Sequence, residues 1–258
     1  MNTPDVRSVA AFKREGWTKK ELRAAVTDGT LERVRRGSYT LPAERDATES
    51  HVLRTLAAVQ VRSDDHTVSH TSAAVLHGLP VRRAALDLVH LTRWSNSHGN
   101  VKAGVQLHRA QVPDHEVVMV HGVRVTTLER TLADLARTEP YDWGVAAADA
   151  ALRAGARAEW LADLVDQGKR LKNNGRLRQV LEFADPRAES AAESMSRVSI
   201  ARAGLPKPEV QFAVHLPDGV AGSPPPTSGG QSSAWWGRWT ARRSTPPTLV
   251  AVGPPPTR

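Results

Sequence analysis

The stretch TKKELRAAVTDGTLERVRRGSYT, residues 18–40, determines how the N-terminal part of this chain is expected to fold. Thr18 and Glu21 have the spacing of a capping box, in which a Thr hydroxyl and a Glu carboxylate satisfy the free amides at a helix start. The spacing predicts a helix from Thr18 to about Thr27, ended by the Asp28-Gly29 pair. Residues 31–35 and 38–41 then predict a short hairpin. A capped helix followed by a basic hairpin is typical of a winged helix-turn-helix.

Positive charge is concentrated in the same stretch. Between Lys13 and Arg36 there are eight Lys and Arg residues against four Asp and Glu, whereas residues 37–218 are close to neutral. Charge confined to one compact segment favours a polyanionic partner, with the capped helix in the major groove and the wing on the phosphates. The expected DNA-binding residues are Thr18, Lys19, Lys20, Arg23, Arg33, Arg35, Arg36 and Tyr39.

Other interpretations of this segment remain open. Tyr39 and Leu41 are expected to pin the wing to the core. The charges would be ordinary solvated surface if the segment were only a small helical cap, and a docking module for another protein has the same outline.

Composition sets the class of the whole chain. With 258 residues, 40% hydrophobic and 24% charged, it has ordinary globular composition and room for one large or two small domains. There is no apolar run long enough for a membrane span and no signal-peptide core at the start, so we expect a soluble cytoplasmic protein without membrane contact. The absence of Cys excludes disulfides, thiol nucleophiles and cysteine-ligated metals.

The middle of the chain predicts a small mixed sheet followed by helices. Periodic apolar residues predict helices over residues 48–62 and 71–77, and β-rich runs predict strands over 86–92, 105–109, 116–120 and 123–126, the last two joined at His121-Gly122. Ala- and Leu-rich segments predict helices over 127–137, 142–153, 157–167 and 176–183, which we expect to cover one face of the sheet.

This region carries no recognised catalytic or metal-binding motif. His70, His77, His90, His108 and His121 lie in or near it, but without an HExxH or HxH pair they are expected to be structural, so no metal site is predicted. Around His70 no Gly-x-Ser-x-Gly elbow supports a Ser nucleophile, and the neighbouring Ser and Thr are expected to cap the helix that starts near residue 71. Gly-rich phosphate loops are also missing, which disfavours nucleoside triphosphate chemistry.

The composition changes near residue 218. A helix over residues 189–203 and a strand over 209–216 are predicted before that point. The 40 residues after Asp218 contain eight Pro, six Gly, three Trp and no acidic residue, which predicts disorder or, alternatively, a Pro-rich ligand for an aromatic groove.

A frameshift is a third interpretation of the tail. Reading the last base of each codon with the first two bases of the next forces Val at Trp235-Trp236, Gly at Trp236-Gly237 and Asp at Trp239-Thr240. Synonymous GC-rich codons then permit two strands that carry an Asp, a Glu-x-Asp and a Lys. Such a cluster holds Mg²⁺ to activate water against a phosphodiester.

Several segments resemble a known family. Residues 16–18, 33–39, 69–80, 123–136 and 183–187 are similar to actinobacterial antitoxins of the AbiEi type, of type IV toxin–antitoxin systems, over about residues 10–218. Members of that family begin with a winged helix, and many end in a domain similar to very-short-patch-repair endonucleases of the PD-(D/E)xK class. The helix that opens that domain resembles residues 193–197, and Glu193 lies where its carboxylate is expected.

The resemblance implies an α+β fold of four parts: a winged helix-turn-helix at residues 1–45, an α/β middle domain with a helical second half at 46–185, an incomplete endonuclease-like remnant at 186–218 and a disordered, out-of-frame tail at 219–258. From Gly219 onward the chain departs from the family pattern. It lacks the Asp, the Glu-x-Asp and the Lys, so only Glu193 remains of the catalytic set, and we expect neither nuclease activity nor a cofactor.

We therefore expect a DNA-binding, antitoxin-like transcriptional regulator with double-stranded DNA, a cognate toxin gene or protein and a second copy of the chain as partners. The alternative is a Mg²⁺-dependent DNA endonuclease, if the C-terminal reading frame is misreported. A third interpretation is a degraded gene product that folds poorly because the helix over residues 189–203 has lost the strands that would cover it.

Overall fold

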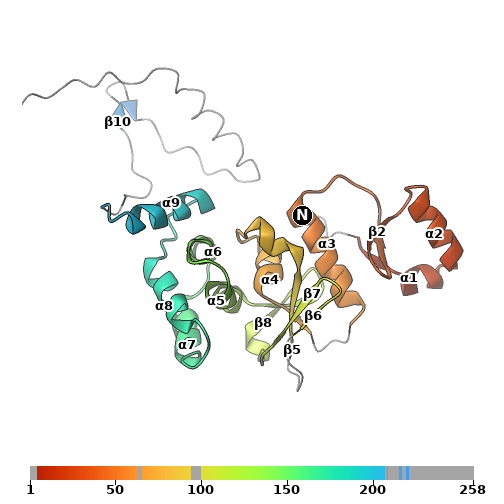
Figure 1. The fold of residues 1–258 in the computed structure, drawn as a ribbon, viewed down its shortest axis with the longest axis horizontal. Helices are drawn as coiled ribbons and strands as arrows, with labels where there is room; N and C mark the ends of the chain where they lie inside the picture. The colour runs from red at the N-terminus through yellow and green to blue at the C-terminus, as the bar shows by residue number, and fades with distance from the viewer. Residues whose placement is uncertain are drawn as a thin grey trace, which may run out of the picture. The chain divides into compact units, whose positions relative to one another are not determined.

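A computed structural model describes residues 5–62, 66–93, 100–206, 208, 215–216 and 219–220. Contacts divide the chain into two compact units, residues 1–210 and 211–258. Helices and strands both contribute, which confirms the α+β class (Figure 1). Among the residues that the structure describes, no helix combines the length and the apolar character needed to cross a lipid bilayer.

The first part of the larger unit contains two helices and a three-stranded sheet. The strands are antiparallel and ordered β1-β3-β2. Phe12, Leu22, Ala25 and Leu31 form the small core under them. The elements are β1 (Arg7–Ser8), α1 (Val9–Arg14), α2 (Lys19–Thr27), β2 (Glu32–Arg35) and β3 (Ser38–Thr40).

The capping box predicted for α2 is present. Thr18 Oγ1 accepts the backbone N–H of Glu21 at 3.2 Å, and the Glu21 carboxylate accepts the backbone N–H of Thr18 at 2.7 Å. Asp28 is the C-cap, and the hairpin of β2 and β3 follows as predicted. One detail was wrong, because Leu41 is 65% exposed and does not pin the wing, whereas Tyr39 does pack edge-on against Phe12.

A six-stranded mixed sheet lies at the centre of the larger unit, in the order β6-β7-β5-β4-β9-β8. β5 pairs in parallel with β7 and β4 with β9, and the remaining pairs are antiparallel. The strands are β4 (Thr67–Val68), β5 (Val89–Arg93), β6 (Asn100–Lys102), β7 (Val105–Arg109), β8 (Val117–Val120) and β9 (Val123–Thr126).

Two helices cover the apolar face of this sheet. α3 (Ala47–Gln60) and α4 (His70–Leu76) contribute Ala58 and Ala73 to a core that also contains Val68, Leu91 and Val125. Val6 packs against α3 in an adjoining cluster, which connects the N-terminal module to the sheet.

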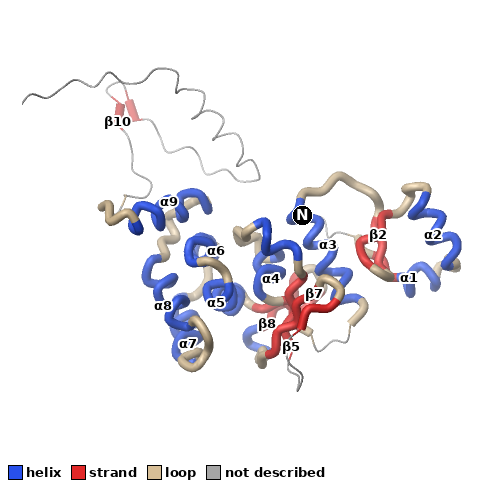
Figure 2. Tube along the Cα trace, in the orientation of Figure 1, coloured by secondary structure: helices blue, strands red, loops and turns tan. Residues whose placement is uncertain are grey.

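The later helices form a second core. Figure 2 shows them gathered beside the strands rather than over them. They pack on one another around Leu132, Val145, Leu177 and Val198, so the prediction that these helices cover one face of the sheet was wrong. They are α5 (Leu128–Thr138), α6 (Tyr141–Arg153), α7 (Ala158–Gln167), α8 (Asn174–Phe183) and α9 (Ala191–Arg202).

Other differences from the predicted elements have local causes. The strand predicted over residues 86–92 begins later, as β5 at Val89, because a 3-10 helix (Arg83–Asp87) occupies its first two positions. The Leu86 carbonyl there accepts from the His51 and Arg54 side chains. Ser69 does not cap α4 with its side chain, since its hydroxyl is engaged by Thr92 at 2.7 Å.

Near the end of the described chain, β10 (His215–Leu216) pairs with β11 (Gly219–Val220). Most of the strand predicted over residues 209–216, and the tail after residue 220, lie outside the described residues.

Candidate functional site

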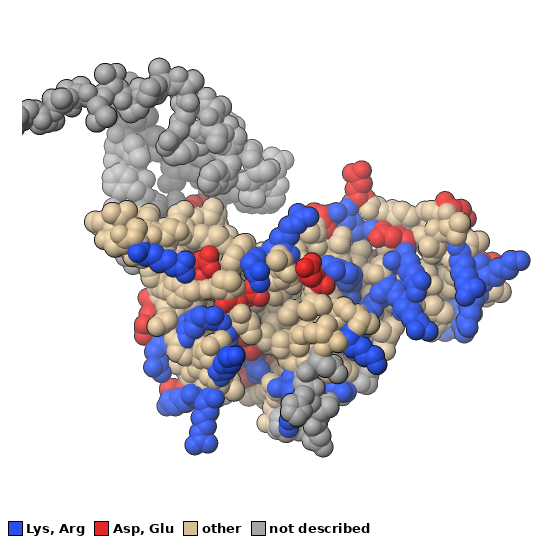
Figure 3. Space-filling model, in the orientation of Figure 1, with Lys and Arg blue, Asp and Glu red and all other residues tan. Residues whose placement is uncertain are grey.

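The N-terminal module presents most of its predicted DNA-binding residues to solvent. Lys19 and Lys20 occupy the first two positions of α2, Arg23 lies one turn later, and Arg33 and Arg36 lie on the hairpin, all exposed. Figure 3 shows blue side chains gathered over these N-terminal elements, at the right of the view.

Three of the predicted residues have structural contacts instead. Thr18 is the helix cap, and Tyr39 is half-buried beside Phe12. Arg35 is also half-buried, and its guanidinium donates to the carbonyl of Ala103 at 3.3 Å. Burial lowers the pKa of Arg35 from its ordinary value. The exposed basic surface therefore contains fewer residues than the predicted DNA-binding set.

Four acidic residues of this module are engaged elsewhere. Glu21 caps α2, and Asp28 accepts from Thr30. Glu15 pairs with Arg7, and Glu32 accepts from Arg45 at 2.6 Å. Within the described part of the chain, none of these carboxylates pairs with the exposed cations of α2 and the hairpin. Those cations are Lys19, Lys20, Arg23, Arg33 and Arg36.

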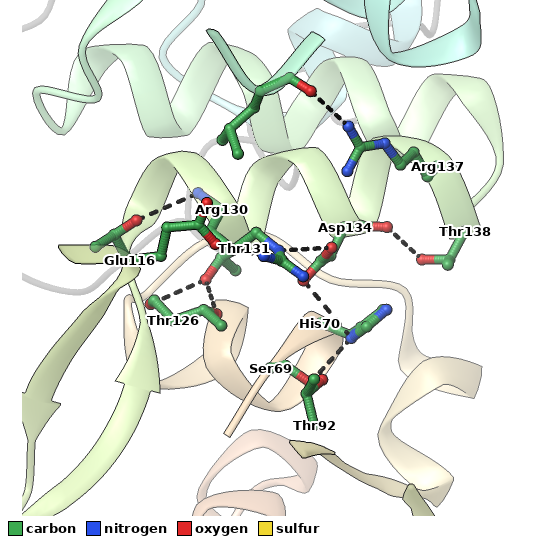
Figure 4. Close-up of polar contacts among 12 residues, drawn as sticks. Ser69, His70, Thr92, Glu116, Thr126, Arg130, Thr131, Asp134, Arg137 and Thr138 are labelled. Carbon is green, nitrogen blue, oxygen red and sulfur yellow. Dashed lines mark hydrogen bonds and ion pairs between the residues drawn. The ribbon is translucent and has the colours of Figure 1, made fainter. Parts of the chain in front are cut away.

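A second polar region lies between the sheet and α5. Arg130 lies between Glu116, with which it forms a close ion pair, and Asp134, at 3.1 Å (Figure 4). Burial raises the pKa of Asp134, and the charge of Arg130 opposes that shift. The Thr126 and Thr131 hydroxyls bond to each other at 2.7 Å beside this network.

Three histidines that the sequence spacing treats as isolated come together next to Asp134. His90 on β5 and His108 on β7 are diagonal neighbours, because Thr92 pairs with His108 across the parallel strands. His70, the first residue of α4, stacks on His108 with ring centroids 3.6 Å apart. Their ligand nitrogens all lie within 4.8 Å of one another.

The three imidazoles are neutral at physiological pH. Burial lowers the pKa of His70, of His90 and of His108 to about 3 in each case. Spacing along the chain gave no signal for this cluster, since it depends on the pairing of β5 with β7 and on the turn that starts α4. The alternation of His90 and Thr92 on one face of β5 was the only clue in the sequence.

Ser69, His70 and Asp134 do not form a catalytic relay. His70 Nδ1 lies 2.9 Å from Ser69 Oγ and 3.9 Å from Asp134 Oδ2. A relay needs the base to face the nucleophile with one ring nitrogen and the carboxylate with the other. Both partners share Nδ1 here, so the arrangement orients the ring and leaves Nε2 free.

Glu193, the residue predicted to remain from a nuclease motif, stabilises the start of α9. Its backbone N–H donates to Ser190 Oγ at 3.2 Å, and its carboxylate accepts the backbone N–H of Glu189 at 2.9 Å. The residues that would complete a nuclease site in another frame lie outside the described residues.

Sequence comparisons relate the chain to known proteins. Residues 67–183 match the AbiEi antitoxin C-terminal domain, which relates the chain to toxin–antitoxin systems. Two uncharacterised proteins of Mycobacterium tuberculosis, MT2308 of strain CDC 1551 / Oshkosh and Rv2248 of strain H37Rv, are each 31% identical over 201 residues, covering 77% of this chain and 70% of their own length.

A solved structure is also similar at low identity. The crystal structure of the Rv2827c protein from Mycobacterium tuberculosis aligns with a TM-score of 0.46 and 14% identity, over 84% of this chain and 85% of that one. By the two sequence matches, the chain belongs to one family with the two uncharacterised mycobacterial proteins, and its residues 67–183 match the AbiEi antitoxin C-terminal domain.

Proposed function

We propose that this protein is a DNA-binding, antitoxin-type transcriptional regulator whose N-terminal module, residues 1–45, is a winged helix-turn-helix. Two consecutive helices followed by a hairpin, with an earlier strand completing the sheet in the order β1-β3-β2, support that assignment. In such a module α2 enters the major groove and the hairpin lies along the phosphates.

The observation that carries the proposal is a set of exposed cations on α2 and the hairpin that form no ion pair with the described residues. Lys19 and Lys20 lie at the positive end of the helix dipole, where a cation lowers helix stability. Glu15, Glu21, Asp28 and Glu32 are engaged with other groups, so these four carboxylates do not neutralise the cations. A DNA phosphate backbone would supply the missing negative charge.

The antitoxin domain supports the regulatory half of the proposal. The winged helix would bind the promoter of its own operon, and the domain over residues 46–185 would bind a cognate toxin or a second copy of the chain. Two copies would read two half-sites one helical turn apart, as dimeric helix-turn-helix proteins do.

The test removes three cations from α2 in the full chain. The K19A/K20A/R23A variant should bind a duplex from upstream of its own gene at least tenfold more weakly at moderate salt. Its log K against log salt should also become shallower by roughly 2 to 3, because about 0.9 counterion is released per phosphate contact.

A matched control removes the same charge elsewhere. K169A/R170A/K172A alters three exposed cations between α7 and α8 and should bind the duplex like the wild type. Circular dichroism would establish that both variants fold. Unchanged affinity in the α2 variant, or an equal loss in both variants, would remove the proposed DNA interface.

A further inference from the structure

The cluster of His70, His90 and His108 has the composition of a metal site. Three neutral imidazoles supplied by α4, β5 and β7 meet at one place, with ligand nitrogens within 4.8 Å of one another. Imidazole nitrogen is a preferred ligand of Zn²⁺ and of its first-row neighbours, and it binds only in the neutral form. His70 is buried, whereas His90 and His108 are half-buried, which leaves a path for an ion.

The hydrogen bonds of the cluster leave lone pairs available. His70 Nδ1 faces Ser69 Oγ, and His90 Nδ1 bonds to His108 Nε2 at 2.9 Å. Nε2 of His70, Nε2 of His90 and Nδ1 of His108 make no hydrogen bond with any described residue. Nε2 of His90 and Nδ1 of His108 can therefore carry the ring protons, which leaves the lone pairs of the facing atoms, His90 Nδ1 and His108 Nε2, to an ion.

His70 has the surroundings of a ligand whose ring is held in place. The Ser69 hydroxyl and, at 3.9 Å, the Asp134 carboxylate both face Nδ1, which directs Nε2 toward solvent or a metal. Carboxylates and hydroxyls on the non-ligating nitrogen are the usual outer partners of metal-bound His. The residue also adopts a left-handed backbone with φ of 49°, a conformation that non-Gly residues adopt at a cost and that is concentrated at functional sites.

Charges of both signs lie around the cluster. Arg130 and Arg137 add to the lowering of the His70 pKa by burial, whereas Asp134 acts in the opposite direction on the pKa of His108. Asp134 is the carboxylate that faces the cluster, at 3.9 Å from His70 Nδ1.

We propose that His70, His90 and His108 bind one divalent transition-metal ion, Zn²⁺ foremost, through three imidazole nitrogens, with a fourth position left to water. In a tetrahedral site with bonds of about 2.0 Å, ligand nitrogens lie about 3.3 Å apart. His90 Nδ1 and His108 Nε2, which lie 2.9 Å apart, must therefore separate slightly. The rings of His70 and His108 stack with an angle of 11° between their planes, so one of them must rotate before both lone pairs can point at the ion. The bound ion would join α4 to the β5–β7 pair.

The experiment titrates the full, untagged chain with Zn²⁺ by calorimetry and with Co²⁺ by visible absorption. The wild type should bind one ion per chain, with the strong d–d bands of four- or five-coordinate Co²⁺, and its midpoint of thermal unfolding should rise with Zn²⁺. The H90Q/H108Q variant, which keeps polar side chains, should lose the bands and at least tenfold in affinity.

His115 provides the matched control, because it is exposed and lies in the 3-10 helix (Asp114–Glu116) before β8. H115Q should bind both ions like the wild type, and circular dichroism should show every variant folded. Absence of a Co²⁺ spectrum in the folded wild type, or equal binding by H90Q/H108Q, would overturn the proposal. DNA binding by the α2 surface is independent of either result.

Discussion

At the scale of single residues, His51 connects three elements of the sheet layer. Its Nδ1–H donates to the Leu86 carbonyl at 2.9 Å, and its Nε2 lies 2.8 Å from Ser72 Oγ, which in turn accepts the backbone N–H of His90 at 2.8 Å. The donor role of Nδ1 follows because a carbonyl can only accept. His51 is fully buried, and burial disfavours a protonated ring.

This arrangement predicts a loss of stability in acid. Burial lowers the pKa of His51 from 6.5 to about 4, and the nearby Arg54 acts in the same direction. Between these values the unfolded chain binds more protons, so the free energy of unfolding falls as the pH falls from 6.5 toward 4.

Replacing His51 separates its contribution to this pH dependence from that of the other buried histidines. Between pH 7 and pH 5, we expect the free energy of unfolding of the H51N variant to fall by about 2 kcal/mol less than that of the wild type. Urea unfolding at the two pH values measures the difference. Parallel losses in both proteins would show that the His51 pKa is the same in the folded and the unfolded chain, against this prediction.

At the scale of elements, Arg130 joins α5 to the strands. It reaches Glu116 just before β8 and Asp134 one turn along its own helix, and all three side chains are at most 12% exposed. Removing one partner of a buried pair leaves an uncompensated charge, which is more damaging than losing an exposed pair.

We therefore expect R130M to lower the free energy of unfolding by about 3 to 5 kcal/mol. The control is R124M, since Arg124 pairs with Asp114 where the side chains are 41% and 93% exposed; its loss should stay below about 1 kcal/mol. Urea unfolding compares them, and similar losses would contradict the role given to burial.

Local signals in the sequence predicted α2, β7, β9 and the hairpin at His121-Gly122 well. Each depends on neighbours in the chain: a capping box, an alternating strand, and left-handed turn residues at His121 and Gly122. β4, with two residues, and α1, with six, are too short to give a periodic pattern.

The polar sites were less accessible to sequence reasoning, for a physical reason. The cations of α2 are adjacent in the chain, so their charge is visible there. His90 and His108 meet only because β5 and β7 pair in parallel, and Arg130 meets Glu116 only through the packing of α5. Such contacts between distant residues are set by tertiary packing, which no local window contains.

At the scale of the whole molecule, net charge and DNA recognition are separable. The chain carries +8, and half of that comes from Arg238, Arg242, Arg243 and Arg258 in the acid-free tail. Basic residues that only neutralise phosphates release counterions from any duplex equally. Charges held on α2 are positioned together on one helix face and can distinguish one groove from another.

We expect an R238Q/R242Q/R243Q/R258Q chain to lose affinity for the upstream duplex and for an unrelated duplex by the same factor. The ratio of the two affinities should then match that of the wild type, with a shallower salt dependence for both. In K19A/K20A/R23A the ratio itself should fall at least tenfold, because α2 is the element that would contact base edges. Competition binding with the two duplexes measures both ratios. If the ratio falls with the tail substitutions but stays unchanged with those in α2, the tail and not the N-terminal module recognises the DNA sequence.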